Sequence, residues 1–153
     1  MDYFFYKTPP KQQTVSTPIA GPFLNKEECE KILASLGDRW DEGSVNVNPS
    51  ALQEGRDNTV RKVKLQAFDN KEIIDRIIAW IHDINQVTYK FDTIGIPDYD
   101  AITVMRYDAD QEGGGHYDYH LDIGPKVMSN RKISFSIQLS HPANYDGGVL
   151  DFM

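Results

Sequence analysis

Four titratable side chains alternate with other residues along one short stretch of the sequence. They are His116, Asp118, His120 and Asp122. Because successive side chains of a β-strand face opposite sides, these four would share one face of a strand, with Tyr117 and Tyr119 on the other. Burying such a row is costly without a partner, and a metal ion is the simplest partner. A solvated strand face beside a loop is the alternative interpretation.

The types of these side chains limit the metal. A His and a carboxylate two residues apart lie about 6.5 Å apart along a strand, so their side chains can converge on one ion. Imidazole and carboxylate without thiolate suit Fe(II), Mn(II) or Zn(II), and two His with one carboxylate form the open site of non-haem Fe(II) oxygenases. The spacing alone does not decide between the His-x-Asp pair at 116–118 and the pair at 120–122.

Several further motifs surround this stretch in a fixed order. They are Tyr107, the glycines at 113–115, Tyr117-Asp-Tyr-His120-Leu-Asp122, Arg131-Lys-Ile-Ser134, and the run from Leu139 to Phe152 with Pro142, Tyr145 and Gly147-Gly148. Together they resemble the prolyl 4-hydroxylase-like branch of the Fe(II)/2-oxoglutarate dioxygenases, which includes bacterial and phage hydroxylases. The resemblance covers the chain from about Phe23 onward, since residues 23–29 are similar to the family's first support helix.

The resemblance implies both a register and a chemistry. It places the metal pair at His120 and Asp122 and leaves His116 as a supporting or cleft-rim residue. It implies an enzyme in which Fe(II) and 2-oxoglutarate hydroxylate a C–H bond of a protein or peptide residue such as proline, releasing succinate and CO2, with ascorbate as a candidate reductant. Tyr107 matches a tyrosine that hydrogen-bonds the far carboxylate of 2-oxoglutarate. A tyrosine packed at a strand end is the alternative for this position.

The family's third metal ligand has no counterpart in these 153 residues. It is a late His, followed by a basic partner for 2-oxoglutarate, and both lie beyond the strand that contains Phe152. His82 falls in a predicted helix and His141 in a turn, so neither matches it. We therefore expect 1–153 to be a single, C-terminally truncated domain with about half of the core strands. The alternative function is a non-catalytic metal-binding or protein-interaction module that retains part of the fold.

Two amphipathic helices are expected to support the candidate metal strand. One begins at a capping box formed by Asn25 and Glu28 and ends at Gly37. The other begins at a box formed by Asp69 and Glu72 and carries isoleucines at helical spacing. Both helices come before most of the predicted strands, which is the order of a fold with separate helical and strand layers.

Strands dominate the second half of the sequence. They are predicted at 44–47 and 59–68 and then, after Pro97, at 100–107, 115–123, 132–140 and 148–153. This order indicates an α+β fold, and the resemblance narrows it to support helices packed on a double-stranded β-helix, a cupin-like jelly roll. Within the third of the late strands, Ile133, Phe135, Ile137 and Leu139 face one way. Residues 1–22 read as an extended N-terminal segment.

Composition excludes several classes of function. The 16 basic and 23 acidic side chains give a net charge of −7 without any basic cluster, so binding to nucleic acid is not expected. The single cysteine, Cys29, allows no disulfide within the chain and favours a reducing, cytoplasmic location. No stretch has the pattern of a signal peptide or of a membrane span. The expected partner is a protein or peptide substrate.

Overall fold

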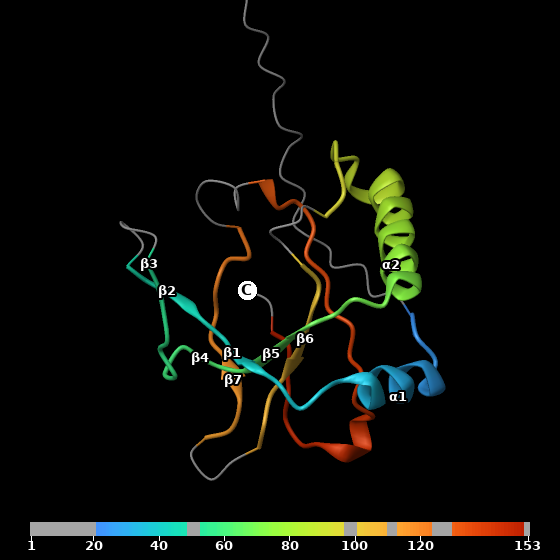
Figure 1. The fold of residues 1–153 in the computed structure, drawn as a ribbon. Helices are drawn as coiled ribbons and strands as arrows, with labels where there is room; N and C mark the ends of the chain where they lie inside the picture. Colours follow the sequence, from blue (N-terminus) through green and yellow to red (C-terminus); the bar gives the residue numbers. More distant parts are fainter. Residues whose placement is uncertain (1–20, 49–52, 97–100, 110–112, 124–129, 152–153) are drawn as a thin grey trace, which may run out of the picture.

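Two α-helices and seven short strands make up the part of the chain that the computed structural model describes (Figure 1). The described residues are 21–48, 53–96, 101–109, 113–123 and 130–151. The elements are α1 (Lys26–Ser35), β1 (Asp41–Glu42), β2 (Val45–Asn48), β3 (Gln53–Gly55), β4 (Arg61–Lys62), β5 (Lys64–Ala67), α2 (Lys71–Ile84), the π-helical turn η1 (Asn85–Tyr89), β6 (Thr103–Arg106), β7 (His116–Tyr117) and the 3-10 turn η3 (Pro142–Asn144). The predicted extended segment at 1–22 lies almost entirely outside them.

The first helix begins at its predicted capping box. The Asn25 side chain accepts the backbone N–H of Glu28 at 2.9 Å, and the Glu28 carboxylate accepts the Asn25 N–H at 2.8 Å. The helix ends at Leu36, whose backbone is extended, one residue before the predicted Gly37. Glu28 also pairs with Arg76 of α2, and Arg76 lies over the Phe23 ring. One residue therefore caps α1 and links it to α2.

The second helix begins one residue later than predicted. Asn70, rather than Asp69, is the N-cap, and its side chain accepts the Ile73 N–H at 3.2 Å, so Glu72 does not close a box. Asp and Asn are both good caps, and therefore two adjacent starts look equivalent in the sequence. After Ile84 the chain continues into η1, where the buried Asn85 bonds the backbone of Phe91 through its amide N–H and its carbonyl oxygen.

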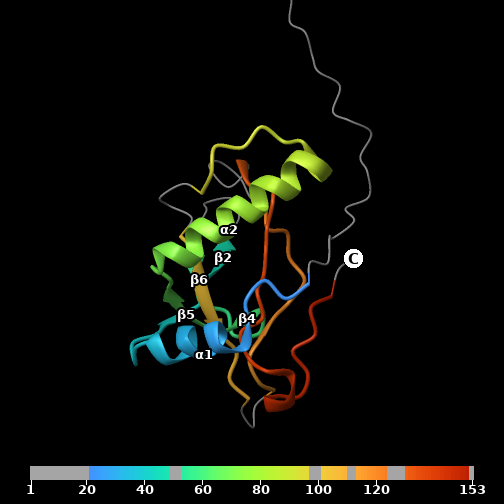
Figure 2. The same cartoon turned by 90° about the vertical axis from the view of Figure 1, so that its right-hand side faces the viewer.

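The core lies where the two helices meet the strand layer. Its buried residues are Leu24, Ile32, Ile73 and Ile77. Partly buried side chains from three other segments pack against them, among them Phe68, Ile102, Phe135, Ile137 and Leu139. Both helices lie on the same side of the strands, as Figures 1 and 2 show. The helices therefore act as a brace on one side of the sheets.

All strand pairs are antiparallel. One sheet has the order β1-β5-β6, and the pairs β2-β3 and β4-β7 stand beside it. In the three-stranded sheet Lys64 lies opposite both Glu42 and Arg106, whereas Leu65 lies opposite Met105. Side chains directly opposite each other share a face, so this sheet has one charged face and one more apolar face. The α+β class predicted from the sequence is confirmed.

Several predicted strands are shorter than expected or absent from the ladders. The segment at 59–68 is interrupted at the buried Val63, and the segment at 115–123 pairs only at His116–Tyr117. Residues 131–139 alternate between partly buried and exposed side chains, but the strand predicted at 132–140 does not form. Residues 148–151 are exposed and form no strand. No closed or curled sheet is formed by the described residues, because short ladders such as β4-β7 do not extend far enough to wrap around.

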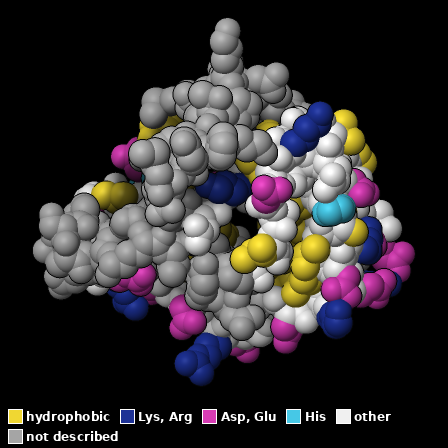
Figure 3. All heavy atoms as spheres, turned by 90° about the horizontal axis from the view of Figure 1, so that it is seen from above, with side chains coloured by type: hydrophobic (Ala, Val, Ile, Leu, Met, Phe, Trp, Pro, Cys, Tyr) yellow, Lys and Arg dark blue, Asp and Glu magenta, His cyan; other side chains and the backbone are white. Residues whose placement is uncertain are grey.

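Large hydrophobic side chains remain at the surface of the later segments. Leu121 and Val149 are 82% and 77% exposed. Figure 3 shows hydrophobic side chains among charged ones on the face seen from above. Among the described residues no helix combines the length and the apolar character needed to cross a membrane.

Candidate metal centre

β7 holds the start of the candidate metal segment against β4. Tyr117 pairs with Arg61 and His116 with Lys62, and the Asp118 N–H donates to the Val60 carbonyl at 2.9 Å. Beyond Asp118 the chain leaves the ladder. The predicted arrangement of four titratable groups on one strand face is therefore wrong, because a strand of two residues cannot impose alternation on the residues that follow it.

The departure from the ladder brings His120 onto Tyr117. Their rings are stacked at 3.6 Å between centroids and 15° between planes, although strict alternation would have put them on opposite faces. The Arg61 guanidinium lies 4.4 Å from the centroid of the same tyrosine ring. Tyr119, by contrast, is 59% exposed. Stacking therefore fixes one imidazole of the segment, and the second tyrosine takes no part in it.

His120 and Asp122 lie close enough to share one ion. The distance from His120 Nε2 to Asp122 Oδ1 is 3.1 Å. Two ligands at right angles around an ion, with bonds of about 2.0–2.2 Å, lie about 2.8–3.1 Å from each other. The two side chains are 37% and 55% exposed, so the pair can be reached from solvent. The geometry fits two adjacent positions of an octahedral site.

The second ring nitrogen of His120 also faces an oxygen atom. His120 Nδ1 lies 2.7 Å from the Asp118 carbonyl, an acceptor to which only a protonated nitrogen can bond. When Nδ1 carries the proton of a neutral ring, Nε2 presents a lone pair to the Asp122 carboxylate. That contact is repulsive unless a second proton or a metal cation lies between them. A carbonyl that orients a metal-binding imidazole in this way is common around metal sites.

The other two titratable residues of the segment bond mainly to backbone. His116 contacts the Gly114 and Thr59 carbonyls through its two ring nitrogens, at 3.2 and 3.3 Å. The Asp118 carboxylate accepts the Tyr119 N–H at 2.8 Å. These contacts help to hold the segment, and neither side chain is placed with His120 and Asp122 around a common point.

Tyr107 lies close to this group but does not contact the metal pair. Its hydroxyl donates to the Met105 sulfur at 3.7 Å. Burial raises the pKa of Tyr107, the charge of Arg61 opposes that rise, and Tyr117 adds to it. Gly115 lies against the Tyr107 backbone, since a Cβ there would be 2.7 Å from the Tyr107 Cα. A side chain at Gly115 would push apart the two segments that carry the candidate site.

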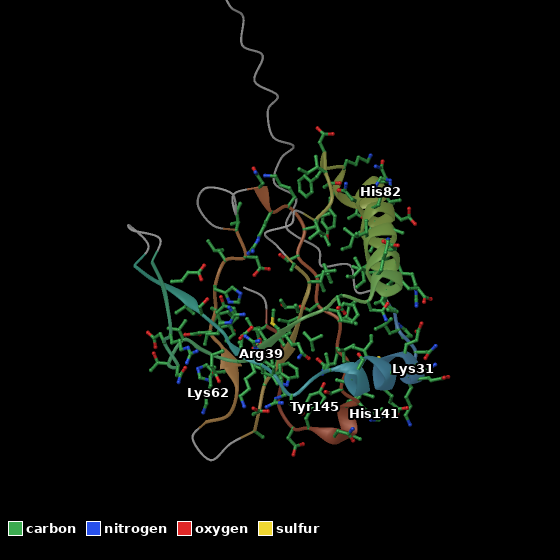
Figure 4. All side chains as sticks on the ribbon, in the orientation of Figure 1. Lys31, Arg39, Lys62, His82, His141 and Tyr145 are labelled. Carbon is green, nitrogen blue, oxygen red and sulfur yellow. The ribbon has the colours of Figure 1, made fainter. Side chains whose placement is uncertain are left out.

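The remaining histidines are placed elsewhere. Figure 4 shows His82 on α2 and His141 beside η3, both on the opposite side of the view from β7. The His141 Nδ1 accepts the Ala143 N–H at 3.2 Å, so this residue caps η3 as a turn residue. Within the described ranges, no three His, Cys, Asp or Glu side chains come together as a metal site. Cys29 is partly buried against the core, and burial raises its pKa.

Two arginines near the site were given no role in it from the sequence. Arg61 stacks on Tyr117 and donates to the Ser44 carbonyl at 2.9 Å. Arg131, part of the Arg-Lys-Ile-Ser motif, donates to the Asp122 carbonyl at 3.1 Å. Motif order alone could have suggested Arg131. Nothing in the local sequence around Arg61 signals its role, because that role depends on strand pairing with a distant segment.

Comparison with known proteins finds no relative of this chain. No protein-family model, no curated protein and no solved structure matches this chain.

Proposed function

We propose that this protein is an Fe(II)- and 2-oxoglutarate-dependent dioxygenase that hydroxylates a C–H bond of a protein or peptide residue, such as proline. The observation that carries the proposal is the 3.1 Å separation of His120 Nε2 and Asp122 Oδ1 within a Tyr-x-x-His-x-Asp motif. In this proposal the two helices are the support helices of a jelly roll, and the short antiparallel ladders belong to its strands.

Iron would supply the oxidising chemistry when bound, with 2-oxoglutarate as the co-substrate. His120 and Asp122 are the side chains that would hold it. The Asp118 carbonyl keeps the His120 proton on Nδ1, and the Tyr117 ring restricts rotation of the imidazole. Arg131 holds the backbone of Asp122 from the neighbouring segment. Supporting contacts of this kind are what a metal site needs in order to present its ligands in one orientation.

Tyr107 is the proposed contact of the co-substrate. Among the described residues its hydroxyl bonds to a single acceptor, the Met105 thioether sulfur, which is weak and would be displaced by a carboxylate oxygen. The neighbouring Arg61 places a positive charge beside the tyrosine, which favours an anion there. Both features support a carboxylate of 2-oxoglutarate as the partner of the Tyr107 hydroxyl.

A second candidate function is a metal-binding or protein-interaction module without catalysis. The observation that favours it is that the described residues bring only His120 and Asp122 together, with no third His, Cys, Asp or Glu beside them. Two protein ligands leave most of an ion's coordination to water, which weakens binding.

Metal titration tests the site shared by both candidates. Anaerobic addition of Fe(II), or of Mn(II) as a paramagnetic probe, should broaden the NMR signals of residues 117–123 first. His120→Ala should weaken binding roughly tenfold or more, whereas the matched variant His116→Ala should change it by less than about twofold. Equal losses in both variants, or broadening spread over the acidic surface, would overturn the assignment of this site.

Succinate release then separates the two functions. A version of the protein that also supplies the third metal ligand, loaded with Fe(II), should convert 2-oxoglutarate to succinate slowly even without substrate. Tyr107→Phe should raise the 2-oxoglutarate concentration that this reaction needs. Metal binding localised to His120 with no succinate formed would favour the non-catalytic module. Succinate release that persists in His120→Ala would contradict the dioxygenase.

A further inference from the structure

A concave site lies on the charged face of the three-stranded sheet. This pocket has a volume of about 350 Å³, and its charged lining residues are Glu42, Arg56, Lys62, Lys64, Arg106 and Asp108. Among the described residues that line it, four are basic and two are acidic, a net charge of +2, although the whole chain carries −7. Positive charge is therefore concentrated in this pocket. Concave walls of one sign strengthen the local field and attract ions of the opposite sign.

None of His120, Asp122 and Tyr107 lines this pocket, although Gly115 lines it and Lys62 lies opposite His116 in the β4-β7 ladder. Lys64 and Arg106 are directly opposite each other in the sheet, so they share one face. Met105 lies opposite Leu65, on the other face of the sheet. Tyr107, which follows Arg106 in the chain, donates its hydroxyl to the Met105 sulfur on that other face.

Ion pairs hold the basic side chains of the pocket wall in position. Asp108 accepts from Lys64 at 2.7 Å and from Arg106 at 2.9 Å. The hydrogen bond from Lys64, followed by that from Arg106, holds the pKa of Asp108 below its ordinary value, so the carboxylate stays charged. Arg106 also lies over the Trp40 ring, 4.8 Å from its centroid. A wall fixed in this way loses little entropy when it binds a ligand.

Unlike Lys64 and Arg106, Arg56 makes no ion pair with a described residue and is exposed at the pocket. Its guanidinium carries a planar set of donors that matches the oxygens of phosphate. Asn58 adds an amide to the same lining, and Lys62 adds a second ammonium group. The pocket therefore places guanidinium, ammonium and neutral amide hydrogen-bond donors around one space.

We propose that this pocket binds the phosphate group of a small phosphorylated molecule. A phosphate dianion matches the excess positive charge of the lining better than a single carboxylate does. The volume lies at the lower end of the range for small-molecule sites, which suits a compact phosphate ester. This site does not depend on the proposed iron chemistry, because its lining includes none of His120, Asp122 and Tyr107.

Phosphate titration of the intact chain tests the proposal. Inorganic phosphate and glycerol 3-phosphate are added at constant ionic strength, and NMR shifts are followed for residues 54–64 and 103–115. The double variant Arg56→Gln/Lys62→Gln should weaken phosphate binding roughly tenfold or more. The double variant Lys26→Gln/Lys31→Gln removes the same charge from α1 and should change binding by less than about twofold. Far-UV circular dichroism confirms that each variant is folded.

Three results would overturn it. They are equal weakening in both double variants, shifts distributed over basic residues outside the pocket, and equal binding of acetate and phosphate. Mn(II) binding at His120 should be unaffected by Arg56→Gln/Lys62→Gln. A parallel loss of both ligands would show that the two sites are not separate.

Discussion

The helical layer and the segment after β7 hold their side chains in different ways. In the helices, Ile73 and Ile77 are 6% and 2% exposed and pack against several other elements. His120 and Asp122 remain 37% and 55% exposed and are held by a carbonyl, a stacked ring and each other. Stability should therefore reside mainly in the first region and ligand binding in the second, and the two properties should respond to different substitutions.

The largest expected effect is on the stability of the helical layer. Ile77→Ala removes a side chain that is only 2% exposed and leaves a cavity in the core, at a cost of about 2–5 kcal/mol of unfolding free energy. The neighbouring Ile78, 38% exposed, is a matched control, and Ile78→Ala should cost under about 1 kcal/mol. Urea unfolding measures both. Equal losses would mean that α2 does not bury the face observed here.

A smaller effect is expected where the residue before β7 packs against the end of β6. Gly115→Ala places a Cβ 2.7 Å from the Tyr107 Cα and 2.9 Å from the Asp108 nitrogen, so the backbone must shift. The cost should be about 1–3 kcal/mol, with weaker Mn(II) binding at His120. At Gly37 the nearest atom to an added Cβ is the Gln66 Nε2, 3.5 Å away, so Gly37→Ala is the control. Unchanged stability in Gly115→Ala would contradict the close approach of these segments.

The two tyrosines of the metal motif offer a sharper comparison within the second region. Tyr117→Leu removes the ring stacked on His120 and should weaken metal binding about three- to tenfold, since aromatic contacts contribute about 0.5–1.5 kcal/mol. Tyr119→Leu alters an exposed ring two residues away and should leave binding unchanged. Mn(II) titration distinguishes them. Equal responses would show that the stack does not orient the imidazole.

The same contrast explains what the sequence could predict. The Asn25 capping box and the alternation of side chains along 132–139 depend on neighbours close in the chain, and both are observed, although the strand predicted at 132–140 does not form. The start of α2 was wrong by one residue because Asp69 and Asn70 are equally good caps. Such errors are small, since local hydrogen bonds and side-chain periodicity decide these features.

The candidate site was predictable only in part. The residues His120 and Asp122 came from a motif, and the structure brings their side chains to within 3.1 Å. The stacking of Tyr117 on His120 could not be predicted, because it requires the strand to end after Asp118. The pairing of Arg61 with Tyr117 joins distant segments, and no local pattern encodes such a register.

The smallest expected effect concerns the link between α1 and α2. The Asn25 backbone hydrogen bond, followed by the hydrogen bond from Arg76, lowers the pKa of Glu28 below its ordinary value of 4.5. A carboxyl whose pKa is lowered by folding stabilises the folded state above its unfolded pKa. This contribution disappears as the pH falls through the folded pKa. Stability conferred by Glu28 should therefore be present at neutral pH and lost in acid.

Glu28→Gln isolates this contribution, because the amide can still accept the Asn25 N–H but carries no charge for Arg76. The variant should be slightly less stable than the parent chain at neutral pH, and the difference should vanish below the folded pKa. Glu72→Gln, an exposed change in the first turn of α2, is the control. Urea unfolding at a series of pH values on both sides of 4.5 measures the difference. If the difference in unfolding free energy between the parent chain and Glu28→Gln instead grew in acid, the charged Glu28 would not stabilise the fold. That result would contradict its role as a charged bridge between the helices.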